Sequence, residues 1–195
     1  MAFKGYVQVY TGNGKGKTTA AIGLAIRALG AGKRVLFLQF MKSKVYSEHQ
    51  ILATISPLFT LETLGKPFFI AKEGSLTAEE LAAWGDEVVV FAPGKPPEEY
   101  KVIMRQGVKR AKAAVSNGQY DVVVLDEIIV ARFFELINDH DMQGILSSRL
   151  DTVELLLTGR GASDQLIEQA DLVTNMQEVK HYYNKGVIAR IGIEN

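Results

Sequence analysis

The distribution of apolar residues along the chain predicts alternating strands and helices. Four short and nearly continuous apolar runs have the length of buried strands; they lie at residues 6–10, 34–40, 122–125 and 153–157. Parallel strands that are covered on both faces show continuous runs of this kind, whereas half-exposed strands alternate apolar and polar residues. We therefore expect four core strands in a mostly parallel sheet.

Helical segments are expected between these strands. Residues 18–29 are rich in alanine and stop just before Gly30 and Gly32, which tolerate the left-handed backbone found at helix ends. Further helices are expected at residues 98–116, 135–148 and 164–169. This alternation predicts a three-layer α/β fold with helices on both faces of the sheet.

The middle of the chain has a weaker pattern. All five prolines lie between residues 57 and 97, which predicts irregular structure there. Thr77 and Glu80 have the spacing of a capping box, so a helix is expected to begin at this point and to run to about Gly85. The apolar run at residues 88–91 is too short to distinguish a strand from a buried helical turn.

Composition narrows the class of protein. The 195 residues are 47% hydrophobic, enough for one core, so a single domain over residues 1–195 is expected. The 22 basic and 22 acidic residues cancel, so neither nucleic acid nor an anionic membrane is an expected partner. The absence of cysteine excludes thiolate metal sites and a cysteine nucleophile. With no signal-like start and no apolar run near the ~18 residues of a membrane span, a cytoplasmic location is expected.

A glycine-rich loop at residues 11–18 carries the first candidate chemistry. It reads Thr-Gly-Asn-Gly-Lys-Gly-Lys-Thr and lies between the first expected strand and the first expected helix. Glycines allow backbone N–H groups to converge on phosphate oxygens, and a helix N-terminus favours anions. The candidate ATP ligands are Gly12, Asn13, Gly14, Lys15, Gly16, Lys17 and Thr18. The usual motif has glycine where this chain has Thr11, and a glycine-rich turn without a ligand is the alternative reading.

Two carboxylates follow a later apolar run. Asp126 and Glu127 come directly after residues 122–125, at the strand end where ligands bind in α/β sheets. Together with the hydroxyl of Thr18, they are candidate ligands for the Mg²⁺ that accompanies ATP. A strand that simply ends in polar residues is the alternative, but the glycine-rich loop in the same chain favours a MgATP site.

Several ordered blocks resemble the corrinoid adenosyltransferases of vitamin B12 synthesis and salvage. The first is Tyr-Thr-Gly-Asn-Gly-Lys-Gly-Lys-Thr-Thr-Ala-Ala at residues 10–21, and in that family the first loop position is also threonine. The others are Leu-Thr-Gly-Arg-Gly at 157–161, Ala-Asp-Leu-Val-Thr at 170–174, Val-Lys-His at 179–181, Lys-Gly-Val at 185–187 and Ile-Gly-Ile-Glu at 191–194.

The resemblance implies a RecA-like P-loop fold, commonly a homodimer, that binds MgATP with its 5′ carbon facing a corrinoid. In such enzymes a Co(I) centre attacks this carbon and inorganic triphosphate leaves, so no protein nucleophile is needed. The resemblance also implies an electron donor such as a flavoprotein, and cobalamin, cobinamide or cobyrinic acid diamide as the corrinoid substrate.

The resemblance also assigns individual residues. Residues 12–18 would bind the triphosphate, Thr18 and Glu127 would hold Mg²⁺ with Asp126 beside them, and Arg160 would add positive charge. Family members place a Phe-x-Trp sequence in the loop that contacts the corrin, whereas this chain has Phe-Phe-Ile at residues 68–70.

Phe68 and Phe69 are therefore the candidate corrinoid-binding residues. The alternative is that this proline-bounded pair forms a small apolar plug beneath a loop. Histidine metal chemistry is not expected, because the three histidines are scattered, and His49 and His140 are expected at the surface.

Two other functions remain open at this stage. A P-loop small-molecule kinase or a RecA-type ATPase would use the same loop and carboxylates to transfer or hydrolyse the γ-phosphate. A nucleotide-binding regulatory module would bind ATP without chemistry. The identity of the phosphate-containing product separates these possibilities.

Overall fold

The computed structural model describes residues 3–43, 46–78, 81–82 and 88–194. Glu80 and Gly85, on which the expected capping box and helix end depend, lie outside the described residues. In the part of the chain that is described, no helix combines the length and the apolar composition needed to cross a bilayer.

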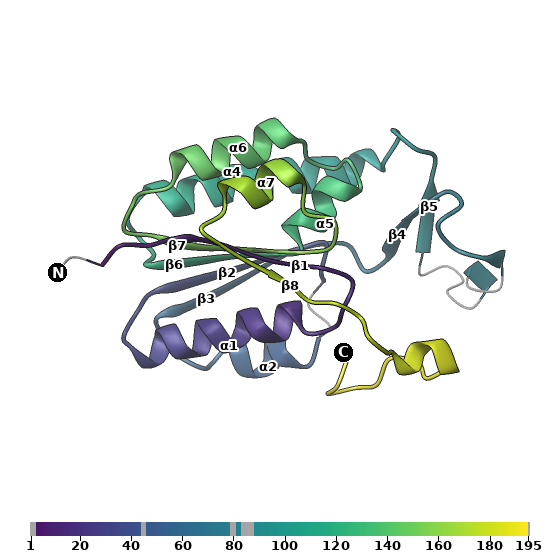
Figure 1. Ribbon diagram of the computed structural model, residues 1–195, viewed down its shortest axis with the longest axis horizontal. Coiled ribbons are helices and arrows are strands. Elements are labelled where there is room, and N and C mark those ends of the chain that lie inside the picture. Colours follow the sequence, from purple (N-terminus) through teal and green to yellow (C-terminus); the bar gives the residue numbers. More distant parts are fainter. Residues whose placement is uncertain (1–2, 44–45, 79–80, 83–87, 195) are drawn as a thin grey trace.

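A twisted sheet of six parallel strands forms the centre of the molecule (Figure 1). The spatial order is β3-β2-β6-β7-β1-β8. The bounds are β1 Val7–Thr11, β2 Val35–Phe40, β3 Phe59–Leu64, β6 Val122–Asp126, β7 Glu154–Thr158 and β8 Leu172–Asn175. The four predicted strands are β1, β2, β6 and β7, so the expected α/β class with a mostly parallel sheet is confirmed.

The two edge strands were not predicted, and their exposure explains why. Every residue of β3 is half-buried and every residue of β8 is exposed, so neither shows the continuous apolar run of a central strand. A second, two-stranded parallel sheet pairs β4, Phe69–Lys72, with β5, Val88–Phe91, beside the main sheet (Figure 1). The undecided run at residues 88–91 is therefore a strand.

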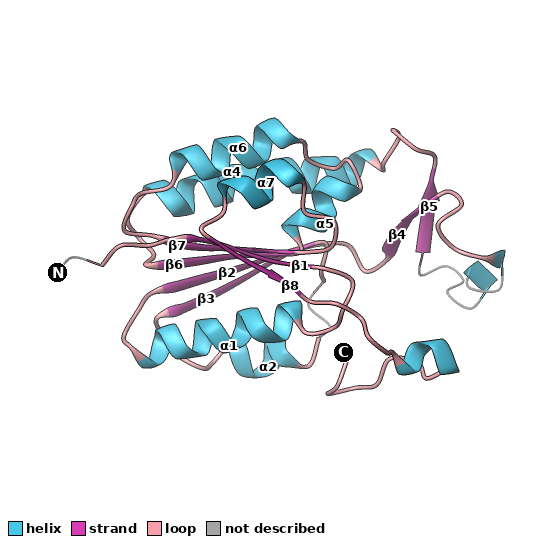
Figure 2. Cartoon of the chain, in the orientation of Figure 1, coloured by secondary structure: helices cyan, strands magenta, loops and turns pink. Residues whose placement is uncertain are grey.

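Helices cover both faces of the main sheet (Figure 2). In the view of Figure 2, α1 and α2 lie below it, and α4, α6 and α7 lie above it. The bounds are α1 Lys17–Gly30, α2 Glu48–Leu52, α4 Glu98–Ser116, α5 Ile128–Phe133, α6 Asp139–Ser148 and α7 Asp164–Gln169, with a 3-10 helix at Tyr182–Lys185. This is the three-layer arrangement of a RecA-like P-loop fold.

The helix expected at residues 135–148 begins later than predicted. Glu135 has a φ of 62°, outside the helical region, and closes the separate helix α5. The next helix begins only after Asn138, whose side chain and that of Asp141 form a capping box. The helix α5 was not predicted from the sequence.

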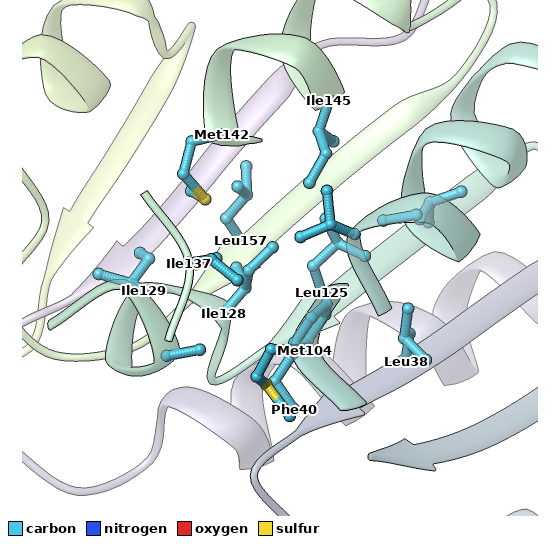
Figure 3. Packing of buried hydrophobic residues seen from close by; sticks show 14 of the residues in the cluster. Leu38, Phe40, Met104, Leu125, Ile128, Ile129, Ile137, Met142, Ile145 and Leu157 are labelled. Carbon is cyan, nitrogen blue, oxygen red and sulfur yellow. The ribbon is translucent and has the colours of Figure 1, made fainter. Parts of the chain in front are cut away.

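The core is divided between the two faces of the sheet. Along β2, Phe37 packs toward α1, whereas Leu36 and Leu38 belong to the larger cluster under α4 and α6. Figure 3 shows part of this larger cluster, where Leu38, Phe40, Leu125 and Leu157 from the strands lie near Met104 and Ile145 from the helices. These buried strands bring the loops that follow β1, β2, β6 and β7 to one edge of the sheet.

Candidate active site

The phosphate loop, residues 11–18, joins β1 to α1 in a wrapped conformation. Gly16 is the N-cap of α1 and has a φ of 110°, which favours glycine. Lys17 is buried, and its Nζ donates hydrogen bonds of 2.7 Å to the carbonyl oxygens of Gly12 and Gly14. Burial lowers the pKa of Lys17. The lysine is therefore already folded back over the loop, at the place where phosphate oxygens bind in loops of this kind.

The extra glycines of the loop are explained by the segment that follows β8. A Cβ atom on Gly12 would lie 2.3 Å from both the Asn175 Oδ1 and the Met176 carbonyl oxygen, closer than atoms can approach. Gly14 donates its N–H to the same Met176 oxygen at 2.7 Å, and a Cβ there would lie 2.8 Å from that oxygen and from the Gln177 oxygen. The C-terminal part of the chain thus crosses directly over the phosphate loop.

Asp126 is the centre of a buried hydrogen-bond network. It ends β6, is fully buried, and accepts hydrogen bonds from Thr18 (3.0 Å), Thr158 (2.7 Å), Gln39 (3.0 Å) and Lys42 (3.1 Å). These donors come from α1, from the ends of β7 and β2, and from the residues after β2. Both carboxylate oxygens are thereby engaged, so Asp126 orients the side chains around it.

Glu127 begins the helix that follows β6 and is held in a constrained backbone conformation. Its φ of 60° lies in the left-handed region, which is uncommon for a residue with a side chain. Its backbone N–H donates to Thr158 Oγ1 at 2.9 Å. Strain of this kind persists only where the surrounding structure fixes it, and here the Thr158 hydroxyl joins the backbone of Glu127 to the Asp126 carboxylate.

The carboxyl group of Glu127 lines a cavity in front of the phosphate loop. Burial, followed by the nearby charge of Asp126, raises the pKa of Glu127; the cations Lys42, Lys17 and Arg160 act in the opposite direction. A carboxylate that is costly to keep charged in the free protein is stabilised when a further cation arrives. This is the behaviour expected of a metal ligand.

The oxygen atoms at this position suit Mg²⁺ bound together with a nucleotide. Mg²⁺ prefers hard oxygen ligands and usually takes one or two from the protein, with phosphates and water supplying the rest. The Thr18 hydroxyl and the Glu127 carboxylate fit this pattern. Among the described residues, no group of three or more His, Cys, Asp or Glu side chains could hold a metal without such help.

Four residues of this network, Thr158, Lys42, Gln39 and His49, were not identified from the sequence as site residues. Lys42 Nζ lies 3.1 Å from Asp126 Oδ2, 3.2 Å from Thr18 Oγ1 and 5.0 Å from the centre of the Tyr46 ring. Burial acts to lower the pKa of Lys42, but the charges of Asp126 and Glu127 outweigh it and raise this pKa, so the side chain stays protonated.

Gln39 and His49 complete this side of the site. His49 Nε2 lies 2.6 Å from Gln39 Oε1, and Gln39 in turn donates to Asp126. The prediction that His49 is a surface residue is wrong, because only 8% of it is exposed. The only sequence signal was a glutamine inside an otherwise apolar strand, which indicates a buried polar partner.

The cavity in front of the phosphate loop has a volume of about 750 Å³. Residues 13–19 form its floor, and Arg160 and Glu127 contribute opposite charges. Phe69 also lines it and is 45% exposed, whereas Phe68 packs against Tyr100, with ring centroids 5.5 Å apart. The structure therefore brings Phe69, rather than Phe68, to the cavity that the phosphate loop forms.

The C-terminal segment, residues 181–194, contributes another wall of the cavity through His181, Gly192, Ile193 and Glu194. Glu194 accepts hydrogen bonds from Lys15 of the phosphate loop at 3.0 Å, from Arg190 at 3.1 Å and from the hydroxyl of Tyr182. These hydrogen bonds, led by that of Arg190, hold the pKa of Glu194 far below its usual range. The Glu194 carboxylate thus ties this segment to the phosphate loop through its ion pair with Lys15.

The sequence matches the family model of the ATP:corrinoid adenosyltransferases BtuR/CobO/CobP over residues 3–195. It is 30% identical over 192 residues to a corrinoid adenosyltransferase of Escherichia coli K12, covering 98% of this chain and 86% of the relative. It is 29% identical over 192 residues to the corrinoid adenosyltransferase CobA of Salmonella typhimurium, with the same coverage of 98% and 86%.

A corrinoid adenosyltransferase of Pseudomonas aeruginosa is similar to the same extent. It is 30% identical over 201 residues, which cover 98% of this chain and 84% of the relative. The match to the family model includes the phosphate loop, the acidic pair and the C-terminal segment. The chain therefore belongs to the ATP:corrinoid adenosyltransferase family.

Proposed function

We propose that the protein transfers the 5′-deoxyadenosyl group of MgATP to the Co(I) centre of a corrinoid and releases inorganic triphosphate. The observation that supports this most strongly is the composition of the cavity. The phosphate loop, the carboxylate residue Glu127 and the aromatic residue Phe69 all line the same space.

The triphosphate is bound by the phosphate loop and by nearby cations. Lys15, Lys17 and Arg160 all line the cavity and supply positive charge. Lys17 exchanges its hydrogen bonds to the loop carbonyls for bonds to phosphate oxygens. Residues 12–18 contribute backbone N–H groups, although that of Gly14 is already bonded to the Met176 oxygen.

Thr18 and Glu127 hold Mg²⁺, and Asp126 fixes the orientation of Thr18 through its hydrogen bond. When bound, Mg²⁺ neutralises charge on the phosphate oxygens and so stabilises the departing triphosphate. The Thr158 hydroxyl holds the backbone of Glu127, which keeps its carboxylate directed toward the loop.

The corrinoid binds over the apolar side of the cavity. We place Phe69 in contact with the macrocycle, because it lines the cavity and is partly exposed. Phe68 lies behind it, and the Tyr100 hydroxyl donates to the Phe68 carbonyl oxygen at 2.8 Å. This anchoring keeps the short strand β4 in place as a wall for a flat, largely apolar ligand.

The chemistry requires positioning rather than a protein nucleophile. The Co(I) electron pair forms the bond to C5′ of ATP, and the bond between C5′ and its oxygen breaks with its electrons going to triphosphate. Co(I) is itself the nucleophile, so the protein must align cobalt, carbon and leaving oxygen and stabilise the charge on that oxygen.

The surroundings of the reaction follow from its substrates. Co(I) must be supplied by an electron donor such as a flavoprotein, and ATP and reduced cobalt coexist in a reducing cytoplasm, which we propose as the location. We also propose a homodimer, because the edge strand β8 and the residues that follow it expose several apolar side chains. These are Leu172, Val173, Val179, Val187, Ile188, Ile191 and Ile193.

The test is anaerobic incubation with ATP, Mg²⁺ and chemically reduced corrinoid, followed by identification of both products. We expect intact triphosphate and a light-sensitive alkylcorrinoid in equal amounts. Lys17→Ala is the control variant and should abolish both products while leaving the circular dichroism spectrum unchanged. Release of ADP and phosphate in step with corrinoid turnover would instead show a phosphoryl-transfer enzyme.

A further inference from the structure

Lys42 is a buried cation that the proposed reaction does not use. It lies two residues after the end of β2, and its side chain is only 13% exposed. Its Nζ donates to Thr18 Oγ1 and Asp126 Oδ2, at 3.2 and 3.1 Å. These two oxygens belong to the same side chains that surround the proposed Mg²⁺ position, so a positive charge already lies among the metal ligands.

The backbone around Lys42 holds it in this place. Met41, immediately before it, has a φ of 61°, which turns the chain sharply at the end of β2. A Cβ on Gly65 would lie 2.6 Å from the carbonyl group of Lys42, so the end of the neighbouring strand packs against this residue. The ring of Tyr46 lies 5.0 Å from Nζ, within the range of a cation–π contact.

The hydrogen-bond capacity of Thr18 shows why Lys42 and a metal compete. A hydroxyl has one proton to donate and two lone pairs to accept with. Thr18 donates its proton to Asp126 and accepts from Lys42. A divalent cation that binds Thr18 Oγ1 would lie within a few ångströms of the ammonium group, and at that distance like charges inside a protein repel strongly.

We propose that the ammonium group of Lys42 occupies the metal subsite in the metal-free protein, where it donates hydrogen bonds to Thr18 and Asp126. A divalent cation displaces this ammonium group when it binds. This inference rests on the metal position given in the proposed function. Lys42 also lines the cavity, so the displaced ammonium group can move toward the triphosphate without leaving the site. The affinity for metal alone is thereby kept low, and the metal is taken up together with the nucleotide.

Binding of Mn²⁺ to the protein without nucleotide or corrinoid tests the proposal, with electron paramagnetic resonance measuring the free ion. Lys42→Met removes the charge and keeps an unbranched side chain of similar length. We expect it to bind Mn²⁺ at least about tenfold more tightly than the wild type, because the like-charge repulsion is gone. Lys42→Arg keeps the charge and should bind no more tightly than the wild type.

Lys66→Met is the matched control for the loss of one positive charge. Lys66 pairs with Glu99 at 2.9 Å and is not among the residues lining the cavity. This variant should leave the affinity for Mn²⁺ unchanged. The proposal is overturned if Lys42→Met binds Mn²⁺ no more tightly than Lys66→Met, or if Lys42→Arg gains as much affinity as Lys42→Met.

A second measurement uses the wild-type protein and does not depend on the folding of any variant. Acetic anhydride labels accessible lysine side chains, and peptide mass spectrometry reports the extent at each position. Saturating Mg²⁺ should increase labelling of Lys42 at least about twofold, because displacement exposes its amine, while labelling of Lys66 stays constant. Unchanged labelling of Lys42 would refute the displacement. Neither experiment involves ATP or corrinoid, so failure here leaves the product analysis of the proposed function intact, and the reverse also holds.

Discussion

Replacement of Thr158 by valine tests the network that holds the two carboxylates. The change keeps the shape of the side chain and removes only the hydroxyl, which is fully buried at the end of β7. That hydroxyl donates to Asp126 Oδ1 at 2.7 Å and accepts from the backbone N–H of Glu127 at 2.9 Å. Thr158→Val therefore breaks two hydrogen bonds at once.

The expected loss of stability follows from these two bonds. A hydrogen bond to a charged group contributes about 1.5–3 kcal/mol, and a buried N–H left without a partner costs about 1–3 kcal/mol. The lower half of the combined range applies, since Asp126 keeps its bonds to Thr18, Gln39 and Lys42. We expect a loss of about 3 kcal/mol, which for a domain of this size lowers Tm by roughly 6–12 °C.

Urea unfolding followed by circular dichroism measures this change, with Thr60→Val as the control. Thr60 is half-buried in the edge strand β3, where valine is well tolerated, so its replacement should change the free energy of unfolding by less than about 0.5 kcal/mol. Thr158→Val should also raise the Mg²⁺ concentration needed for adenosyl transfer, because Glu127 loses its backbone anchor. Equal stability of the two variants would refute the account of the network.

Three further predictions concern other parts of the site. The folded state raises the pKa of Glu127, so its carboxyl group favours folding at low pH, and this contribution is lost as the pH rises above about 4.3 and through the folded pKa. In EDTA, the Tm of Glu127→Gln should therefore increase relative to that of the wild type as the pH rises. A Tm difference that does not depend on pH would contradict this. Phe69→Ala should raise KM for the corrinoid and leave KM for ATP unchanged, whereas Phe68→Ala should mainly lower Tm. Steady-state kinetics and thermal melts distinguish the two variants. If Phe69→Ala raised both KM values equally, this would argue against contact between Phe69 and the corrin. Gly12→Ala should abolish ATP binding in calorimetry, because its Cβ would lie 2.3 Å from the Met176 carbonyl oxygen. The control Gly23→Ala has open space around it on α1 and should gain about 0.5–1 kcal/mol of stability. Retained ATP binding by Gly12→Ala would mean that the segment after β8 can move aside.

The sequence predicted those parts of the fold and site whose signal is local. The four central strands were found because burial on both faces leaves continuous apolar runs, whereas β3 and β8 lie at the edges and lack them. The phosphate loop and the pair Asp126 and Glu127 are short motifs that can be read directly from the chain.

The partners of Asp126 could not be predicted in the same way. Gln39 lies in β2, Lys42 follows β2 and Thr158 ends β7, and only the strand order β2-β6-β7 brings them beside Asp126. Their positions along the chain have no fixed spacing from Asp126, so no single motif joins them to it. Sheet order, rather than sequence proximity, assembles the electrostatic part of the site.

The position of β1 within the sheet determines when the phosphate loop can form during synthesis. β1 is the first strand to be made, yet its two neighbours are β7 and β8, with Val7 opposite Leu155 and Gln8 opposite Leu172. Until those late segments emerge from the ribosome, the strand that supports the loop has no hydrogen-bonded neighbour. Contacts of such long sequence separation form slowly, because the intervening chain must first be ordered. Nucleotide binding by this protein is therefore a property of the completed chain, and a nascent chain that stops before β7 holds the whole phosphate-loop sequence without a phosphate site.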